Sequence, residues 1–166
     1  MRFRVESAHP FAMPTPMPVV EPLPPRPPPI VLTFAASDPT GGAGLQADIL
    51  TQASMGCHPL SVVTALTVQD TAGVEDVLPI DAGWISDQAR ALLEDIPVAA
   101  FKLGLLGSVE AVAAIAEIIA DYPDIPLVFD PVLASGRGDQ IADEDTIDAM
   151  IDKTSALYER LLAGCC

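Results

Sequence analysis

The sequence predicts an α/β fold in which helices cover a mostly parallel β-sheet. Of the 166 residues, 50% are hydrophobic but only 5% are aromatic, so Ala, Val, Ile and Leu carry most of the apolar content. That composition is typical of buried parallel strands packed under helices. Short apolar runs also alternate along the chain with segments whose apolar residues recur at helical spacing. Successive strand–helix–strand units of this kind form a right-handed, doubly wound sheet.

The strands are expected where apolar residues run together between polar or glycine-rich segments. The first, at residues 30–36, is apolar almost throughout and is therefore expected to be buried on both faces. Further strands are expected at residues 60–68, 74–80, 99–103 and 127–129.

The helices are expected between these strands. The first spans about 45–55, and Gly56 is placed to end it. The second spans about 83–93, with Asp81 as its candidate cap. Ser108 is expected to cap a third helix, and a last helix is expected to begin near residue 143.

Composition divides the chain into three parts. Residues 1–29 hold ten of the seventeen prolines, which fix φ and remove backbone donors. We therefore expect a disordered or polyproline II extension there. Residues 30–150 are expected to form the folded domain, and residues 151–166 a divergent tail.

The charge of the chain excludes several classes of partner. A formal net charge of −15 argues against nucleic acid and against an anionic membrane surface, both of which attract clustered Lys and Arg. No apolar run approaches the roughly 20 residues of a membrane-spanning helix. The three cysteines, Cys57, Cys165 and Cys166, lack the paired spacing of a disulfide framework, so a cytoplasmic location is expected.

The segments that follow the strands carry the polar residues. Ligands on doubly wound sheets bind beyond the carboxyl ends of the strands, so residues 37–44, 69–73, 104–107 and 130–138 are expected to converge. The first holds a glycine-rich turn before a helix, but it has neither the dinucleotide nor the P-loop spacing. The turn is either ligand-facing, with Gly41 and Gly42 as substrate-binding residues, or a purely structural tight turn.

Three side chains near these segments have more than one possible role. Asp48 could accept hydrogen bonds from a ligand, or it could complement the dipole of its helix. Gln69 has the donors and acceptor that suit the edge of a heterocycle, or it could be an ordinary polar residue opening a loop. Lys102 lies within an apolar strand, where it could pair with a carboxylate, face a phosphate or lie at an exposed edge.

Several blocks in the right order resemble hydroxymethylpyrimidine/phosphomethylpyrimidine kinases. They read LTFAASDPTGGAGLQAD at residues 32–48, SVVTALTVQDT at 61–71, KLGLL at 102–106, DPVL at 130–133 and SG at 135–136. The resemblance implies a ribokinase-like three-layer αβα fold. It also implies phosphorylation of 4-amino-5-hydroxymethyl-2-methylpyrimidine, and then of its monophosphate, with ATP and magnesium as cofactors. By the same resemblance, Gln69 reads the pyrimidine edge and Asp48 lies in the same pocket. Leu105 replaces a methionine that packs on the ring, and Asp70 stands where the family usually has Asn.

The chain also departs from the family pattern. A Thr-Pro-Asn segment with a downstream Glu near magnesium, and a Gly-Thr-Gly-Cys turn that forms an anion hole, do not occur in the 166 residues. We therefore assign no catalytic or metal-binding residue, and we expect a truncated chain with impaired phosphoryl transfer. Two alternatives stay open: a non-catalytic pyrimidine-binding fragment or partner of a chain carrying the missing half, and a pyridoxal kinase-like enzyme. A homo-oligomer is a further expectation.

Overall fold

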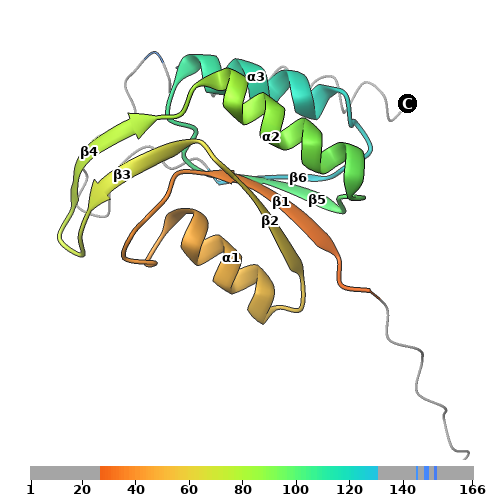
Figure 1. Cartoon of the computed structure of the whole chain (residues 1–166), viewed down its shortest axis with the longest axis horizontal. Helices are drawn as coiled ribbons and strands as arrows, with labels where there is room; N and C mark the ends of the chain where they lie inside the picture. The colour runs from red at the N-terminus through yellow and green to blue at the C-terminus, as the bar shows by residue number, and fades with distance from the viewer. Residues whose placement is uncertain (1–26, 131–144, 146–147, 150–151, 153–166) are drawn as a thin grey trace, which may run out of the picture.

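The computed structural model describes residues 27–130, 145, 148, 149 and 152, and its main sheet has four parallel strands (Figure 1). Their spatial order is β2 (His58–Val63), β1 (Ile30–Ala35), β5 (Ala100–Leu103) and β6 (Leu127–Phe129). Every neighbouring pair in this sheet is parallel, so the predicted sheet type is confirmed.

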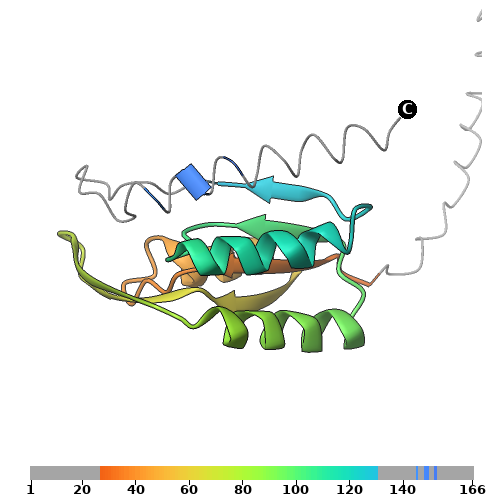
Figure 2. The ribbon, with the colours of Figure 1, turned by 90° about the horizontal axis from the view of Figure 1, so that it is seen from above.

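Helices cover both faces of the sheet and give the described chain three layers (Figure 1), and the view from above shows α2 and α3 running side by side (Figure 2). One face carries α1 (Gly44–Ser54), and the other carries α2 (Ala82–Asp95) and α3 (Val109–Ala120) side by side. The three-layer α/β architecture predicted from the sequence is therefore confirmed.

The helix ends lie where the local sequence predicts them. The Asp81 carboxylate accepts hydrogen bonds from the first N–H groups of α2, and the Ser108 hydroxyl accepts one from Ala111 in α3. Caps of this kind are each worth about 1 kcal/mol. Gly56 follows α1 with a φ of 80° and donates to the Ala53 carbonyl, as expected for a helix stop.

The larger part of the core lies between the sheet and the α2–α3 layer. Phe34 and Phe101, on neighbouring strands, are fully buried with ring centroids 6.4 Å apart. Apolar residues of the two helices pack on them and their neighbours, among them Ile85, Ala89, Val112, Ile115 and Ile119. In contrast, Leu45 is the one buried residue of α1, so this helix is held with much less apolar contact.

The strand expected at residues 60–68 is wrong as a single element. β2 ends at Val63, and β3 (Ala65–Gln69) leaves the main sheet to form an antiparallel hairpin with β4 (Val74–Pro79). Thr64 lies between them, fully buried: its N–H donates to the Ala35 carbonyl and its hydroxyl to the Leu105 carbonyl. These bonds fix the point at which the chain leaves the parallel sheet. The sequence does not predict this point, because the strand-forming residues continue through it.

Two predicted segments fall mainly outside the described residues. They are the proline-rich extension at 1–29, of which residues 27–29 are described, and the tail at 151–166, of which Asp152 is described. For the last predicted helix, the described residues Asp145, Asp148, Ala149 and Asp152 are helical.

The glycine-rich turn between β1 and α1 is organised by the buried carboxylate of Asp38. It accepts hydrogen bonds from the Thr40 N–H at 2.8 Å, from the Thr40 hydroxyl, and from the Ala43 N–H at 2.7 Å. Burial alone would raise the pKa of Asp38, but the hydrogen bonds from Thr40 and Ala43 outweigh it and hold that pKa below its ordinary value. Gly44 closes the turn with a φ of 57°, and a Cβ there would lie 2.6 Å from the Ala36 carbonyl oxygen.

The unequal packing of the strands gives a first prediction. Leu32 in β1 is fully buried, whereas Leu78 in β4 is 63% exposed. We expect Leu32→Ala to lower the free energy of unfolding by about 2–5 kcal/mol, because it removes core contacts and leaves a cavity. Leu78→Ala is the matched control and should cost less than about 1 kcal/mol in the same urea titration. Equal losses in the two variants would contradict the assignment of the core.

The turn gives a second prediction. Asp38→Asn should lower the free energy of unfolding by about 1–3 kcal/mol at neutral pH, because an amide has one accepting oxygen where the turn uses two. Asp87→Asn, at an exposed position on α2, is the matched control and should stay within about 0.5 kcal/mol.

The pH dependence of this difference is part of the same test. Because the folded-state pKa of Asp38 is lowered, its contribution to stability is complete above the unfolded pKa and is lost as pH falls through the folded value. The gap between wild type and Asp38→Asn should therefore narrow below about pH 4, measured by urea unfolding at several pH values. A gap that stays constant on acidification would refute the role of the ionised carboxylate.

Candidate ligand-binding site

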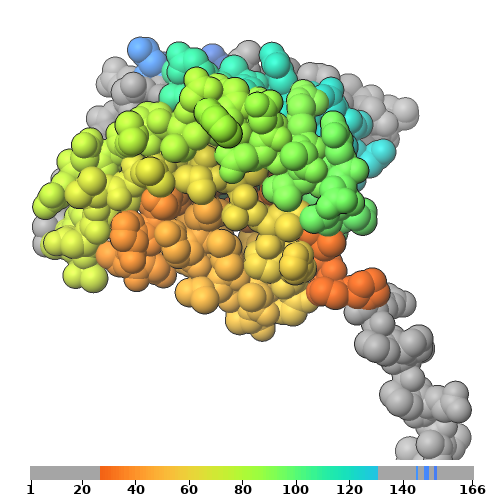
Figure 3. Space-filling view, viewed as in Figure 1, coloured from red at the N-terminus to blue at the C-terminus, as the bar shows by residue number. Residues whose placement is uncertain are grey.

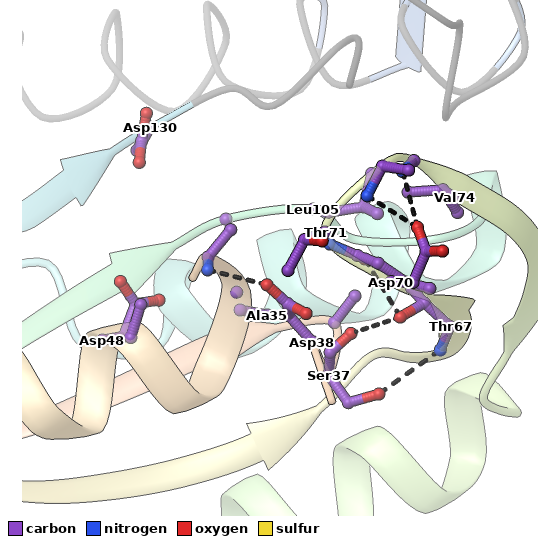
Figure 4. Close-up of a pocket in the computed structure, with 18 of the residues that line it drawn as sticks. Ala35, Ser37, Asp38, Asp48, Thr67, Asp70, Thr71, Val74, Leu105 and Asp130 are labelled. Carbon is purple, nitrogen blue, oxygen red and sulfur yellow. Dashed lines mark hydrogen bonds between the residues drawn. The ribbon is translucent and has the colours of Figure 1, made fainter. Parts of the chain in front are cut away.

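A pocket of about 610 Å³ opens beyond the carboxyl ends of the parallel strands (Figure 4). Its volume is within the range of small-molecule sites, roughly 300–1,000 Å³. The segments that follow β1, β3, β5 and β6 all contribute to its wall, as the topology predicts. From the last of these, expected at 130–138, Asp130 is the described residue.

The structure brings three of the predicted site residues together. Asp48 from α1, Gln69 from the end of β3 and Leu105 from the segment after β5 all line the pocket. Gly41 and Gly42 are not among the lining residues, although their turn continues into Ala43 and Gly44, which are.

The backbone N–H groups of the glycine-rich turn form hydrogen bonds within the turn itself. The Gly41 N–H donates to the Asp38 carbonyl and the Gly42 N–H to the Thr40 hydroxyl, while the Ala43 N–H donates to the Asp38 carboxylate. The Leu45 N–H bonds the Ala36 carbonyl. These bonds favour the structural role of the turn over direct recognition of a ligand by its N–H groups.

The β3–β4 hairpin forms one wall, and Thr67 fastens it to the segment after β1. The Thr67 N–H donates to the Ser37 hydroxyl at 3.3 Å, and Thr67 Oγ1 lies 2.8 Å from the Ser37 carbonyl oxygen (Figure 4). The hairpin and this segment meet at the left of the molecule in Figure 3. Thr67 Oγ1 also lies 3.2 Å from Gln69 Oε1, so the two side chains lie on the same face of β3.

Asp70 shapes the tip of the same hairpin. Its Oδ1 accepts hydrogen bonds from the N–H groups of Ala72 at 2.7 Å and Gly73 at 3.0 Å. An asparagine has the same accepting oxygen at the same place, so the turn accommodates either residue. The replacement of the family's usual Asn therefore keeps this wall intact.

Lys102 provides the pocket's positive charge among the described residues. Its Nζ lies 2.8 Å from Asp48 Oδ2 and 3.6 Å from Asp130 Oδ2. Of the three roles open for this lysine, the structure therefore shows pairing with carboxylates. Asp48 is the fifth residue of α1, and α1 has no acidic residue in its first turn. Its contact with Lys102 thus accounts for Asp48 better than the helix dipole does.

The described lining is acidic and offers little to a nucleotide. It carries the carboxylates of Asp38, Asp48, Asp70 and Asp130 against the single ammonium of Lys102. Within residues 27–130 and the four described residues beyond them, no group of His, Cys, Asp or Glu is arranged to hold a metal ion. The described pocket lining therefore offers one cation to a nucleotide phosphate and no cluster of three or more metal ligands. In this same part of the chain, no helix has the length and apolar character needed to cross a membrane.

Two contributors to the site were not anticipated from the sequence. Asp38 is one, although an aspartate two residues before a threonine at the entry to a helix is a signal for local hydrogen bonding by its side chain. Thr67 was included in a strand, and its alternation with Gln69 could have placed both on the same face.

Known proteins that this chain matches in sequence and structure include phosphomethylpyrimidine kinases and pyridoxal kinases. A family model for phosphomethylpyrimidine kinase matches residues 38–159. A hydroxymethylpyrimidine/phosphomethylpyrimidine kinase of Streptomyces coelicolor is 43% identical over 131 residues, which cover 78% of this chain and 48% of the relative. The chain thus spans about half the length of this curated relative.

Solved structures agree in fold. A phosphomethylpyrimidine kinase from Clostridium difficile superposes with a TM-score of 0.68 at 30% identity, covering 81% of this chain and 71% of the other. A Staphylococcus aureus pyridoxal kinase, solved with ADP, gives a TM-score of 0.64 at 28% identity over 76% of this chain and 45% of the other. The family match over most of the chain, the αβα fold and the pocket at its strand ends lead to one conclusion: the chain belongs to the phosphomethylpyrimidine kinase family.

Proposed function

We propose that this chain supplies the pyrimidine-binding part of a kinase that phosphorylates 4-amino-5-hydroxymethyl-2-methylpyrimidine and its monophosphate in thiamine biosynthesis. The observation that carries the proposal is the meeting of Gln69, Asp48 and Leu105 in one pocket. These residues lie far apart in the sequence, and the family resemblance assigns all three to the same ligand.

The chemistry of the three side chains complements this pyrimidine. The ring edge carries an amino donor beside a ring-nitrogen acceptor, and the Gln69 amide offers the opposite pair. The Asp48 carboxylate can accept a hydrogen bond from the ligand's amino or hydroxymethyl group. Leu105 is nearly buried and supplies an apolar wall for the ring.

The two expected cofactors, ATP and magnesium, have different support. The family and the ADP-bound relative support ATP as the phosphoryl donor, and magnesium is part of the proposal through the family resemblance alone. The role proposed for the described residues is to bind and orient the pyrimidine. The proposal also includes a small-molecule substrate and a cytoplasmic location. The chain would act as a homo-oligomer, or, as the alternative, together with a partner chain that carries the remaining groups.

Pyridoxal is the second candidate ligand, because pyridoxal kinases are among the structural relatives. It shares a hydroxymethyl group on a six-membered aromatic ring. Competition between the pyrimidine and pyridoxal in a calorimetric titration separates the two, and we expect the pyrimidine to bind more tightly.

Removing the Gln69 amide tests the pocket directly. We expect Gln69→Ala to weaken pyrimidine binding about tenfold or more, because a ligand edge that was hydrogen-bonded is left unpaired. Isothermal titration calorimetry measures the change in Kd. Gln88→Ala, at an exposed position on α2, is the matched control and should leave Kd unchanged. An unchanged Kd in Gln69→Ala would refute the assignment of this pocket as the pyrimidine-binding site.

A turnover assay tests the division of roles. We expect the 166-residue chain by itself to bind the pyrimidine without measurable ATP-dependent phosphorylation, because the Thr-Pro-Asn and Gly-Thr-Gly-Cys segments that the family resemblance assigns to magnesium and the anion hole do not occur in it. A coupled assay for ADP release is the measurement, with the Streptomyces coelicolor relative as positive control. Robust turnover by this chain would show that the proposed division is wrong.

A further inference from the structure

Lys102 is placed to hold two carboxylates that come from different parts of the fold. It extends from β5, its side chain is only 15% exposed, and its Nζ lies 2.8 Å from Asp48 Oδ2 on α1. The same Nζ lies 3.6 Å from Asp130 Oδ2, just beyond the end of β6. One ammonium therefore links α1 to the carboxyl ends of two adjacent strands, at the wall of the pocket.

Gly104 leaves the space that this ammonium occupies. A Cβ at Gly104 would lie 3.2 Å from Lys102 Nζ and 3.1 Å from the Ala35 Cβ. Both contacts are tighter than ordinary packing, so a side chain at this position would displace the ammonium or the strand beside it. The glycine is thus matched to the lysine two residues before it.

Without the ammonium, the two carboxylates would have no compensating charge between them. Asp48 is 19% exposed, so its charge is only partly solvated, and Asp130 would repel it. α1 itself is held on the sheet by Leu45 and by the hydrogen bond from Gln52 Nε2 to Thr33 Oγ1 at 2.7 Å. Packing therefore places the backbone of α1, and the contact with Lys102 fixes where the Asp48 carboxylate lies within the pocket.

We propose that Lys102 is a positioning residue, which fixes the carboxylate of Asp48 for the ligand by pairing with it and with Asp130. The binding part of this inference rests on the proposed pyrimidine site. Lys102 acts through Asp48, so its effect on the ligand should require an ionised Asp48 side chain.

The test is a double-mutant cycle on the full chain, with 4-amino-5-hydroxymethyl-2-methylpyrimidine as the probe. Calorimetry gives Kd for wild type, Lys102→Met, Asp48→Asn and the double variant. We expect Lys102→Met to weaken binding about tenfold alone, but less than about twofold when Asp48→Asn is already present. Arg90→Met is the control, since it breaks the exposed Arg90–Asp121 pair at 3.3 Å on another surface and should leave Kd unchanged.

Thermal unfolding of the same four proteins gives an independent answer. We expect Lys102→Met to lower Tm by about 3 °C in wild type, and to have little effect in the Asp48→Asn background. If Lys102→Met does not fold, Gly104→Ala keeps every charge while crowding the ammonium. It should weaken binding in wild type more than in Asp48→Asn.

The positioning role of Lys102 and the proposed pyrimidine binding can fail separately in these experiments. A Lys102→Met penalty of equal size in both backgrounds, in Kd or in Tm, would overturn the positioning role. So would wild-type affinity in Lys102→Met. If wild type itself does not bind the pyrimidine, the proposed function fails, and the thermal cycle alone decides whether Lys102 positions Asp48.

Discussion

The buried junction at Thr64 is the constraint on which the arrangement of the site depends. Its N–H bonds the end of β1, its hydroxyl bonds the Leu105 carbonyl, and its own carbonyl accepts from the Ile80 N–H after β4. A Cβ at Gly107 would lie 3.0 Å from this carbonyl oxygen, so the segment after β5 also packs closely against it. Through these contacts, one residue ends β2 and sends the chain out of the sheet into the hairpin. Gln69 reaches the pocket only because the hairpin leaves the sheet at this point.

Two kinds of force hold opposite walls of the pocket. The hairpin wall is held by neutral hydrogen bonds, such as those between Thr67 and Ser37. In the wall formed by α1, the Asp48 carboxylate is held by charge, through Lys102. The buried Asp38 also lines the pocket, and its carboxylate fixes the turn from which α1 begins. The ligand site thus combines a rigid frame with a charged cluster whose strength depends on ionic conditions.

Much of this arrangement follows from the sequence, because periodicity and strand-end position are local signals. The apolar runs indicate the parallel strands, and the rule that ligands bind beyond their carboxyl ends brings Gln69 and Leu105 to one edge. The place of Asp48 in the same pocket follows from the family resemblance alone. The break at Thr64 was not predictable in this way, since a threonine among valines and alanines is an ordinary strand residue. The partner of Lys102 was also undecided, because Asp48 lies 54 residues away and the contact depends on how α1 packs. Gly41 and Gly42 show the limit of motif analysis: their spacing indicated a tight turn, but not which way its donors point.

The long sequence separation between β1 and its neighbour β5 has a consequence for folding during synthesis. β1 is one of the two interior strands of the described sheet, and its neighbours come from distant parts of the chain: Ile30 pairs with His58 on one side, and Val31 pairs with Ala100 on the other. During synthesis, one edge of this apolar strand therefore stays without its neighbour until β5 has left the ribosome, an interval of several seconds at about 5–20 residues per second. Closing such distant pairs is slow, and exposed strand edges attract other chains. Yield in a cell is therefore expected to depend on chaperones that shield β1 during this interval.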